Sequence, residues 1–111
     1  MMKEIKAFVR PDKVDEIIRH LKEKGFDNLT VSTAEGTGKF QGNNNFVPQK
    51  FAETDNKVAK LELVAEKEDV EAIVWIISDY GRTDNPGDGI IYVSDVLRAI
   101  RVKTGDDAFL K

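Results

Sequence analysis

The chain repeats one order of sequence patterns, a strand followed by a helix and a second strand, and this repetition constrains its fold most. In the first half, residues 3–10 alternate apolar and polar side chains, and residues 14–21 carry apolar side chains at the spacing of one helical face. Residues 29–34 form a second strand pattern, and Gly25 is placed to cap the helix. The first half therefore predicts a strand–helix–strand unit.

The second half has the same order. Residues 57–65 alternate as a strand does, a helical pattern runs over about 68–80, and residues 90–93 are β-branched and aromatic. Asp95 is expected to cap a short helical turn that continues to residue 100. Residues 101–103 are expected to form a last short strand. The second unit thus matches the first in order and in length.

Two such units predict a ferredoxin-like α+β fold in a single domain of 111 residues, with an antiparallel sheet whose two helices cover one face. The pattern leaves open which apolar set meets the helices. In one assignment the residues that face the helices are Ala7, Leu61, Leu63, Ile91 and Val93. It leaves on the uncovered face Phe8, Val64, Ile90 and Tyr92, and the reverse assignment exchanges the two sets. Either uncovered area exceeds what a monomer usually exposes, so we expect a homo-oligomer formed through this face.

Composition excludes several classes of protein and of site. The net charge of −3 gives no basic footprint, so a nucleic-acid partner is not expected. Cysteine is absent, which excludes disulfides, thiolate metal sites and a cysteine nucleophile. No apolar run approaches the roughly 18 residues of a membrane span, and the first residues lack the apolar stretch of a signal peptide. We therefore expect a cytoplasmic protein that does not insert into membranes.

A glycine-containing turn precedes the last long strand pattern. Asn85-Pro86-Gly87 reads as a turn, and Gly89 adds a second position that tolerates a positive φ. Backbone N–H groups at two such glycines could hold an anion, typically a phosphate. A plain turn without a ligand is the alternative, because Asp88 would repel a phosphate unless nearby cations outweigh it.

Residues 36–56 show neither a helix nor a strand pattern. A segment of this length within a compact domain is usually a binding loop or disordered. It carries three phenylalanines, which suit contact with a partner surface, although they could equally fold back on their own domain: Phe40, Phe46 and Phe51.

Catalysis is the rival class of function, because ferredoxin-like folds include small acyl-phosphate hydrolases. The single histidine, His20, lies on the expected outer side of the first helix and has no second ligand four residues later. Asp84, Asp88 and Asp95 are close in sequence, but a turn and a helix cap account for Asp84 and Asp95 better than a metal does. We therefore expect no catalytic residue and no metal site.

Short motifs over nearly the whole chain match one known family. They occupy residues 5–11, 29–31, 36–39, 60–64 and 101–105. Most specific is Thr83-x-x-x-Gly87-Asp88-Gly89, followed by a hydrophobic strand. In these motifs the chain resembles the PII signal-transduction proteins, small trimeric regulators named for nitrogen control.

The resemblance implies a trimer whose intersubunit clefts bind ATP or ADP, with or without magnesium. The long loop would report nucleotide state to a regulated protein such as a membrane transporter or a metabolic enzyme. The loop side of the cleft would be lined by Gly36, Thr37, Gly38 and Lys39. The adenine would be held by Thr30, Glu62, Leu63 and Val64. Phosphates and ribose would be cradled by Gly87, Asp88 and Gly89, with positive charge from Arg101 and Lys103.

Three departures from the family pattern limit these expectations. Ile90 stands where the family has a lysine or arginine, so we expect weaker or ADP-preferring binding. Phe40 replaces the glutamine that helps hold magnesium and 2-oxoglutarate, so 2-oxoglutarate should add little. The only tyrosines are Tyr80 and Tyr92, which excludes modification of a loop tyrosine. The alternative is a trimer of this family that has lost ATP and 2-oxoglutarate sensing and binds another ligand or partner.

Overall fold

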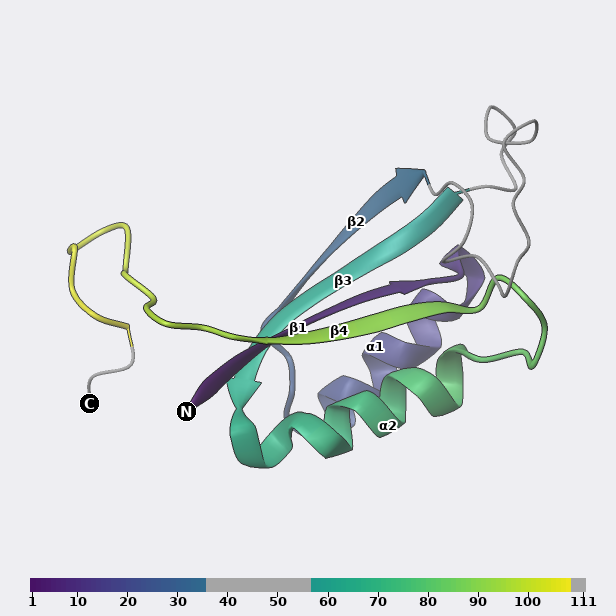
Figure 1. Cartoon of the computed structure of the whole chain (residues 1–111), viewed down its shortest axis with the longest axis horizontal. Coiled ribbons are helices and arrows are strands. Elements are labelled where there is room, and N and C mark those ends of the chain that lie inside the picture. Colours follow the sequence, from purple (N-terminus) through teal and green to yellow (C-terminus); the bar gives the residue numbers. More distant parts are fainter. Residues whose placement is uncertain (36–56, 109–111) are drawn as a thin grey trace.

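The computed structural model describes residues 1–35 and 57–108, which form one four-stranded sheet and two α-helices, each preceded by a short 3-10 helix, Pro11–Lys13 before the first and Lys67–Asp69 before the second. The elements in chain order are β1 (Met2–Val9), α1 (Val14–Glu23), β2 (Leu29–Glu35), β3 (Lys57–Glu66), α2 (Val70–Gly81) and β4 (Gly89–Asp95). The strand order is β2-β3-β1-β4, and every neighbouring pair is antiparallel. Both helices cover the same face of the sheet (Figure 1). The predicted ferredoxin-like arrangement is confirmed.

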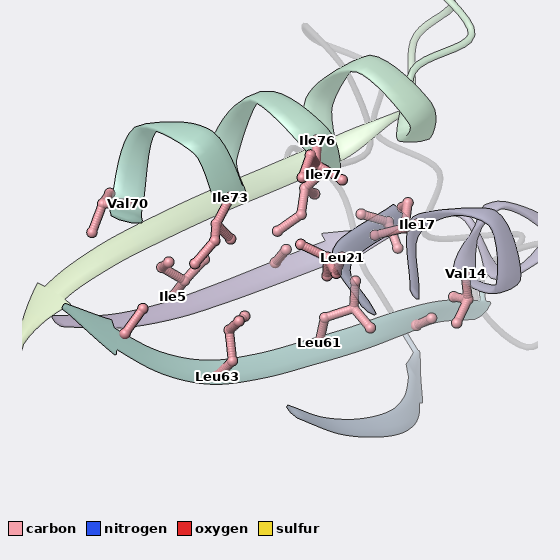
Figure 2. Packing of buried hydrophobic residues seen from close by; sticks show 14 residues of the cluster. Ile5, Val14, Ile17, Leu21, Leu61, Leu63, Val70, Ile73, Ile76 and Ile77 are labelled. Atoms are coloured by element: carbon pink, nitrogen blue, oxygen red, sulfur yellow. The ribbon is translucent and has the colours of Figure 1, made fainter. Parts of the chain in front are cut away.

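The core lies between the sheet and the two helices. Alternate residues of the central strands point into it, including Ile5 of β1 and Leu61 of β3, both without solvent exposure. They meet apolar side chains of α1 and α2 such as Ile17 and Ile73 (Figure 2). The structure therefore selects the assignment in which Ala7, Leu61 and Leu63 face the helices.

The end of α1 follows the sequence expectation. Gly25 has a φ of +90°, and its N–H donates to the Lys22 carbonyl at 2.9 Å. The Phe26 N–H donates to the Leu21 carbonyl, also at 2.9 Å. These two bonds form a Schellman motif, which satisfies carbonyls that the last helical turn leaves unpaired.

The uncovered face of the sheet is partly apolar. Phe8 and Tyr92 contact each other edge to face, with ring centroids 6.3 Å apart, and Ile90 and Val64 are exposed. In the paired register, charged residues occupy the middle of the same face over β1 and β3, namely Lys6, Lys60 and Glu62. The expected apolar area is therefore present but is divided by charged residues.

Two expectations for the C-terminal part are wrong. Asp95 does not cap a helix: it is the last residue of β4, lies opposite Lys3 of β1, and accepts a hydrogen bond from the Lys3 ammonium. Continued strand pairing together with this ion pair outweighs the capping tendency of an aspartate. Residues 101–103 do not form a strand. A turn covers residues 102–104, and the Gly105 N–H donates to the Arg101 carbonyl across it at 2.8 Å.

Residues 96–108 project past the end of the sheet, away from the helices (Figure 1). They are held together by their own bonds, including an isolated bridge between Ile100 and Asp107. Leu97 and Val102 are almost fully exposed. Within the described ranges, neither helix is long and apolar enough to cross a membrane.

Candidate functional site

The loop that joins α2 to β4 is built around the carboxylate of Asp88. One carboxylate oxygen accepts hydrogen bonds from the backbone N–H groups of Thr83, at 2.6 Å, and Asp84, at 2.9 Å. The other accepts from the Thr83 hydroxyl at 2.6 Å and from Nε of Arg10 at 2.9 Å. A carboxylate offers about four acceptor positions, so Asp88 is saturated by its own chain.

Arg10 ties this loop to the sheet. Besides contacting Asp88, its Nη2 donates to the Pro86 carbonyl at 2.8 Å. Arg10 follows the last residue of β1, and Val9 pairs with Gly89 at the start of β4, so antiparallel pairing brings residue 10 beside residue 88. Sequence reasoning missed this role. The signal that could have found it is the antiparallel pairing itself, which makes the residue after β1 a neighbour of the residue before β4.

The charge of Asp88 is compensated within the chain. Burial on its own raises the pKa of the Asp88 carboxyl, but the hydrogen bonds from Thr83, Arg10 and Asp84 outweigh burial and leave that pKa far below its ordinary value. The group is thus an ionised carboxylate paired with a guanidinium. Arg10 of the same chain therefore already reduces the expected repulsion between Asp88 and a phosphate, and no cation from a second subunit is needed for this.

Both glycines of the turn have backbone angles that favour glycine. Gly87 has a φ of +98° and Gly89 a φ of +112°. A Cβ built at Gly89 would lie 1.8 Å from the Phe8 carbonyl oxygen, which is not a permissible contact. Gly89 is thus required by its close approach to β1, whether or not a ligand binds.

A hollow of about 200 Å³ lies beside this loop, between the end of α2 and the start of β4. Apolar side chains form most of its wall, with Arg82 and Asp88 as its charged residues: Phe8, Val9, Ile77, Ser78, Gly81, Arg82, Asp88, Gly89, Ile90 and Ile91. Apart from the two charged side chains, it offers contacts that suit a flat or apolar group.

A second hollow, of about 390 Å³, lies over β2 and β3 on the uncovered face of the sheet. It is lined by Glu4, Asn28, Thr30, Glu62, Leu63 and Val64. Thr30 lies opposite Glu62 in the strand pairing. The four residues that the resemblance implies for adenine binding are therefore brought together.

The two hollows are far apart within one chain. Both reach β1, where Phe8 lines the first and Glu4 the second, and four residues of a strand span roughly 13 Å. The first extends from there to β4 and the second to β2. Arg101 and Lys103 lie in the projecting C-terminal segment, where Nη2 of Arg101 donates to the Ala108 carbonyl at 3.4 Å. One chain does not bring these three groups of residues into one cleft.

Several expected site residues lie outside the described residues. They are Gly36, Thr37, Gly38 and Lys39 of the implied nucleotide cleft, and the phenylalanines Phe40, Phe46 and Phe51 of the implied partner loop.

The residues considered for metal binding or catalysis are His20 and the acidic side chains. No group of three or more His, Asp or Glu side chains there could hold a metal ion. His20 is not an open surface side chain as expected, because its ring stacks on Tyr80 at a centroid distance of 3.6 Å and its side chain is only 20% exposed. Its Nδ1 lies 3.4 Å from a carboxylate oxygen of Glu23. The histidine has a packing role in the helix layer.

Comparison with known proteins gives a consistent result over almost the full length. A family model described as "Nitrogen regulatory protein P-II" matches residues 2–106. Proteins with that name from Cereibacter sphaeroides and Rhizobium meliloti are 37% and 34% identical, each match covering 95% of both chains. The structure of Arabidopsis thaliana PII bound to citrate superimposes with a TM-score of 0.75 at 30% identity, covering 97% of this chain and 89% of that one.

Proposed function

The chain belongs to the nitrogen regulatory protein P-II family, and from that premise we propose that it binds ATP or ADP in clefts between the subunits of a homotrimer. Proteins of this family are oligomeric, non-enzymatic regulators of partner proteins. We propose further that nucleotide state is passed through residues 36–56 to a cytoplasmic face of a membrane transporter or to a metabolic enzyme, in nitrogen regulation. The working compartment is the cytoplasm.

The observation that carries this proposal is the loop held in shape by Asp88. Arg10, Thr83 and Asp84 satisfy the Asp88 carboxylate, and both flanking glycines adopt positive φ angles. A loop fixed in advance loses less conformational freedom when an anion binds, which favours affinity. In this proposal Asp88 shapes the loop, and the backbone around Gly87 and Gly89 approaches the phosphates.

The separation of the two hollows favours a site shared between copies. The hollow that contains Thr30 and Glu62 lies toward one edge of the sheet, and the Asp88 loop lies at the other. The segment at 96–108, which contains Arg101 and Lys103, projects from the end of the sheet (Figure 1). A cleft between neighbouring subunits would combine these groups, and the two cations would face the nucleotide phosphates. Magnesium, where it is bound, would accompany those phosphates.

A relative supports anion binding in a general sense. The solved structure of Arabidopsis thaliana PII contains citrate, a multiply charged anion. For this chain, Ile90 follows Gly89 at the start of β4 and carries no charge. The absence of a third cation lowers attraction most for the longest phosphate chain, so we propose that ADP is bound at least as well as ATP. With Phe40 in the loop, 2-oxoglutarate adds little.

Ile90 also favours one alternative. Its side chain is exposed and lines the same hollow as Asp88, which gives that hollow a more apolar mouth than a phosphate site requires. The second candidate function is therefore a trimer of this family that binds a different small anion or a partner without ATP.

Isothermal titration with ATP, ADP and AMP, with and without magnesium and 2-oxoglutarate, tests the nucleotide. We expect saturable heat with ADP and ATP in the micromolar range or weaker, a marked loss with AMP, and no added effect of 2-oxoglutarate. Arg101→Gln should abolish most of the heat. Arg98→Gln is the matched control, since it removes the same charge from an exposed position of the same segment.

Equal effects of the two arginine substitutions would contradict the assigned role of Arg101. No heat with any adenine nucleotide would favour the second candidate function. Native mass spectrometry tests the trimer separately, and a monomer at micromolar concentration would contradict a site between subunits.

A further inference from the structure

One large apolar side chain is exposed on the helix layer. Trp75 lies on α2 with 60% of its surface accessible. The other exposed large hydrophobic residues of the described ranges belong to Met1, to the strands or to the C-terminal segment. Because the helices cover the face of the sheet opposite the uncovered one, an oligomer built through the uncovered face leaves Trp75 on the outside.

The indole is supported from one side. The rings of Trp75 and Tyr80 meet edge to face, with centroids 6.3 Å apart at 88°. Tyr80 in turn stacks on His20 of α1 at 3.6 Å and 7°. A ring packed in this way has fewer accessible rotamers, so binding a ligand against it costs little side-chain entropy.

The charge beside the indole is negative. Glu71 and Asp79 lie four residues before and after Trp75, so all three share one side of α2, and all three are exposed. The helix contains no lysine, arginine or histidine. Within the described ranges neither carboxylate has an ion-pair partner, whereas on α1 the carboxylates of Glu16 and Glu23 both contact Arg19.

We propose that this Trp75 surface, made of Glu71, Trp75 and Asp79, docks a protein segment that presents arginine or lysine. The face of an indole is electronegative and attracts a cation, arginine most effectively because its planar guanidinium also stacks. Unpaired carboxylates on either side add charge complementarity. The surface provides a contact to a cationic partner in addition to the loop at 36–56 and independent of nucleotide binding.

Fluorescence offers a direct test because Trp75 is the only tryptophan in the chain. The full-length protein is titrated with a helical alanine-based peptide that carries arginines on one face, and with the same peptide in which citrulline replaces arginine. We expect a saturable change in Trp75 emission with the arginine peptide and none with citrulline. Calorimetry should show about three- to fivefold weaker binding of the arginine peptide to Trp75→Ala.

A charge-matched pair of variants separates local docking from general attraction to an acidic protein. Glu71→Gln with Asp79→Asn should weaken binding about threefold. Asp12→Asn with Asp15→Asn should not, although these carboxylates, of the Pro11–Lys13 3-10 helix and of α1, are also exposed. Equal losses in both pairs, equal binding of the citrulline peptide, or peptide binding without a change in Trp75 emission would each overturn the proposal. Dimerisation that depends on Trp75 would also overturn it, by showing that a second copy occupies the surface.

Discussion

The loop at residues 82–89 and the segment at residues 96–108 flank the same strand, β4, but differ in what holds them. The loop is bonded to the sheet through Arg10 and through the close approach of Gly89 to Phe8. The C-terminal segment is bonded mainly to itself and projects from the sheet. The glycine loop is therefore shaped within each chain, whereas the bonds described within one chain do not fix the segment of Arg101 and Lys103 against the sheet.

The largest effect is expected at Gly89. Gly89→Ala places a Cβ against the Phe8 carbonyl oxygen at a strained φ, so β1 and β4 must separate locally. We expect the free energy of unfolding to fall by about 3 kcal/mol or more. Urea denaturation followed by circular dichroism measures it.

Gly105→Ala is the matched control for Gly89→Ala. Gly105 also has a positive φ, +75°, but a Cβ there has nothing within 4 Å. Its cost should stay at about 1 kcal/mol or less, because strain is the only penalty and the segment can adjust. Equal costs at residues 89 and 105 would remove the difference between loop and segment.

Asp88→Asn should have the next largest effect. It removes the ion pair with Arg10 and weakens the bonds to Thr83 and Asp84, so we expect a loss of about 2 kcal/mol in the free energy of unfolding. Asp84→Asn in the same loop is the control, since the ion pair that Asp84 makes with Arg82, at 3.8 Å, is exposed. A double-mutant cycle with Arg10→Gln should give a coupling energy of about 1 kcal/mol. Additive losses would show that Arg10 and Asp88 do not act together.

The contribution of the Asp88 carboxylate to stability should depend on pH. The folded protein depresses the pKa of Asp88, so this carboxyl stabilises the fold fully above the pKa of an unfolded aspartate, about 4, and progressively less as the pH falls below it. The difference in unfolding free energy between wild type and Asp88→Asn should therefore shrink between pH 5 and pH 2. A difference that stays constant over that range would contradict a depressed pKa. Denaturation at a series of pH values measures it.

The smallest effect on stability is expected at Arg101. Its side chain is exposed and donates a long hydrogen bond to the Ala108 carbonyl within the projecting segment, so Arg101→Gln should change the unfolding free energy by less than about 0.5 kcal/mol. The same variant is expected to lose nucleotide affinity. A destabilisation as large as that of Asp88→Asn would show that the segment is integral to the monomer fold.

The sequence predicted the sheet, both helices and the Gly25 cap because each depends on local periodicity or on a single backbone requirement. It did not predict where β4 ends, since continued pairing with β1 and the Lys3–Asp95 ion pair are contacts between distant residues. For the same reason the role of Arg10 escaped notice. The adenine-side residues share one hollow because β2 and β3 pair, yet no local pattern places Arg101 and Lys103.

The contact between Gly89 and the Phe8 carbonyl also bears on how mutational data for this chain should be interpreted. In a saturation library selected only for correct folding, position 89 should retain glycine and reject every alternative, with no nucleotide in the medium. Loss of every substitution at position 89 would then reflect the steric contact with β1 and not ligand binding. A library selected for response to a ligand should instead vary neighbouring positions such as 90.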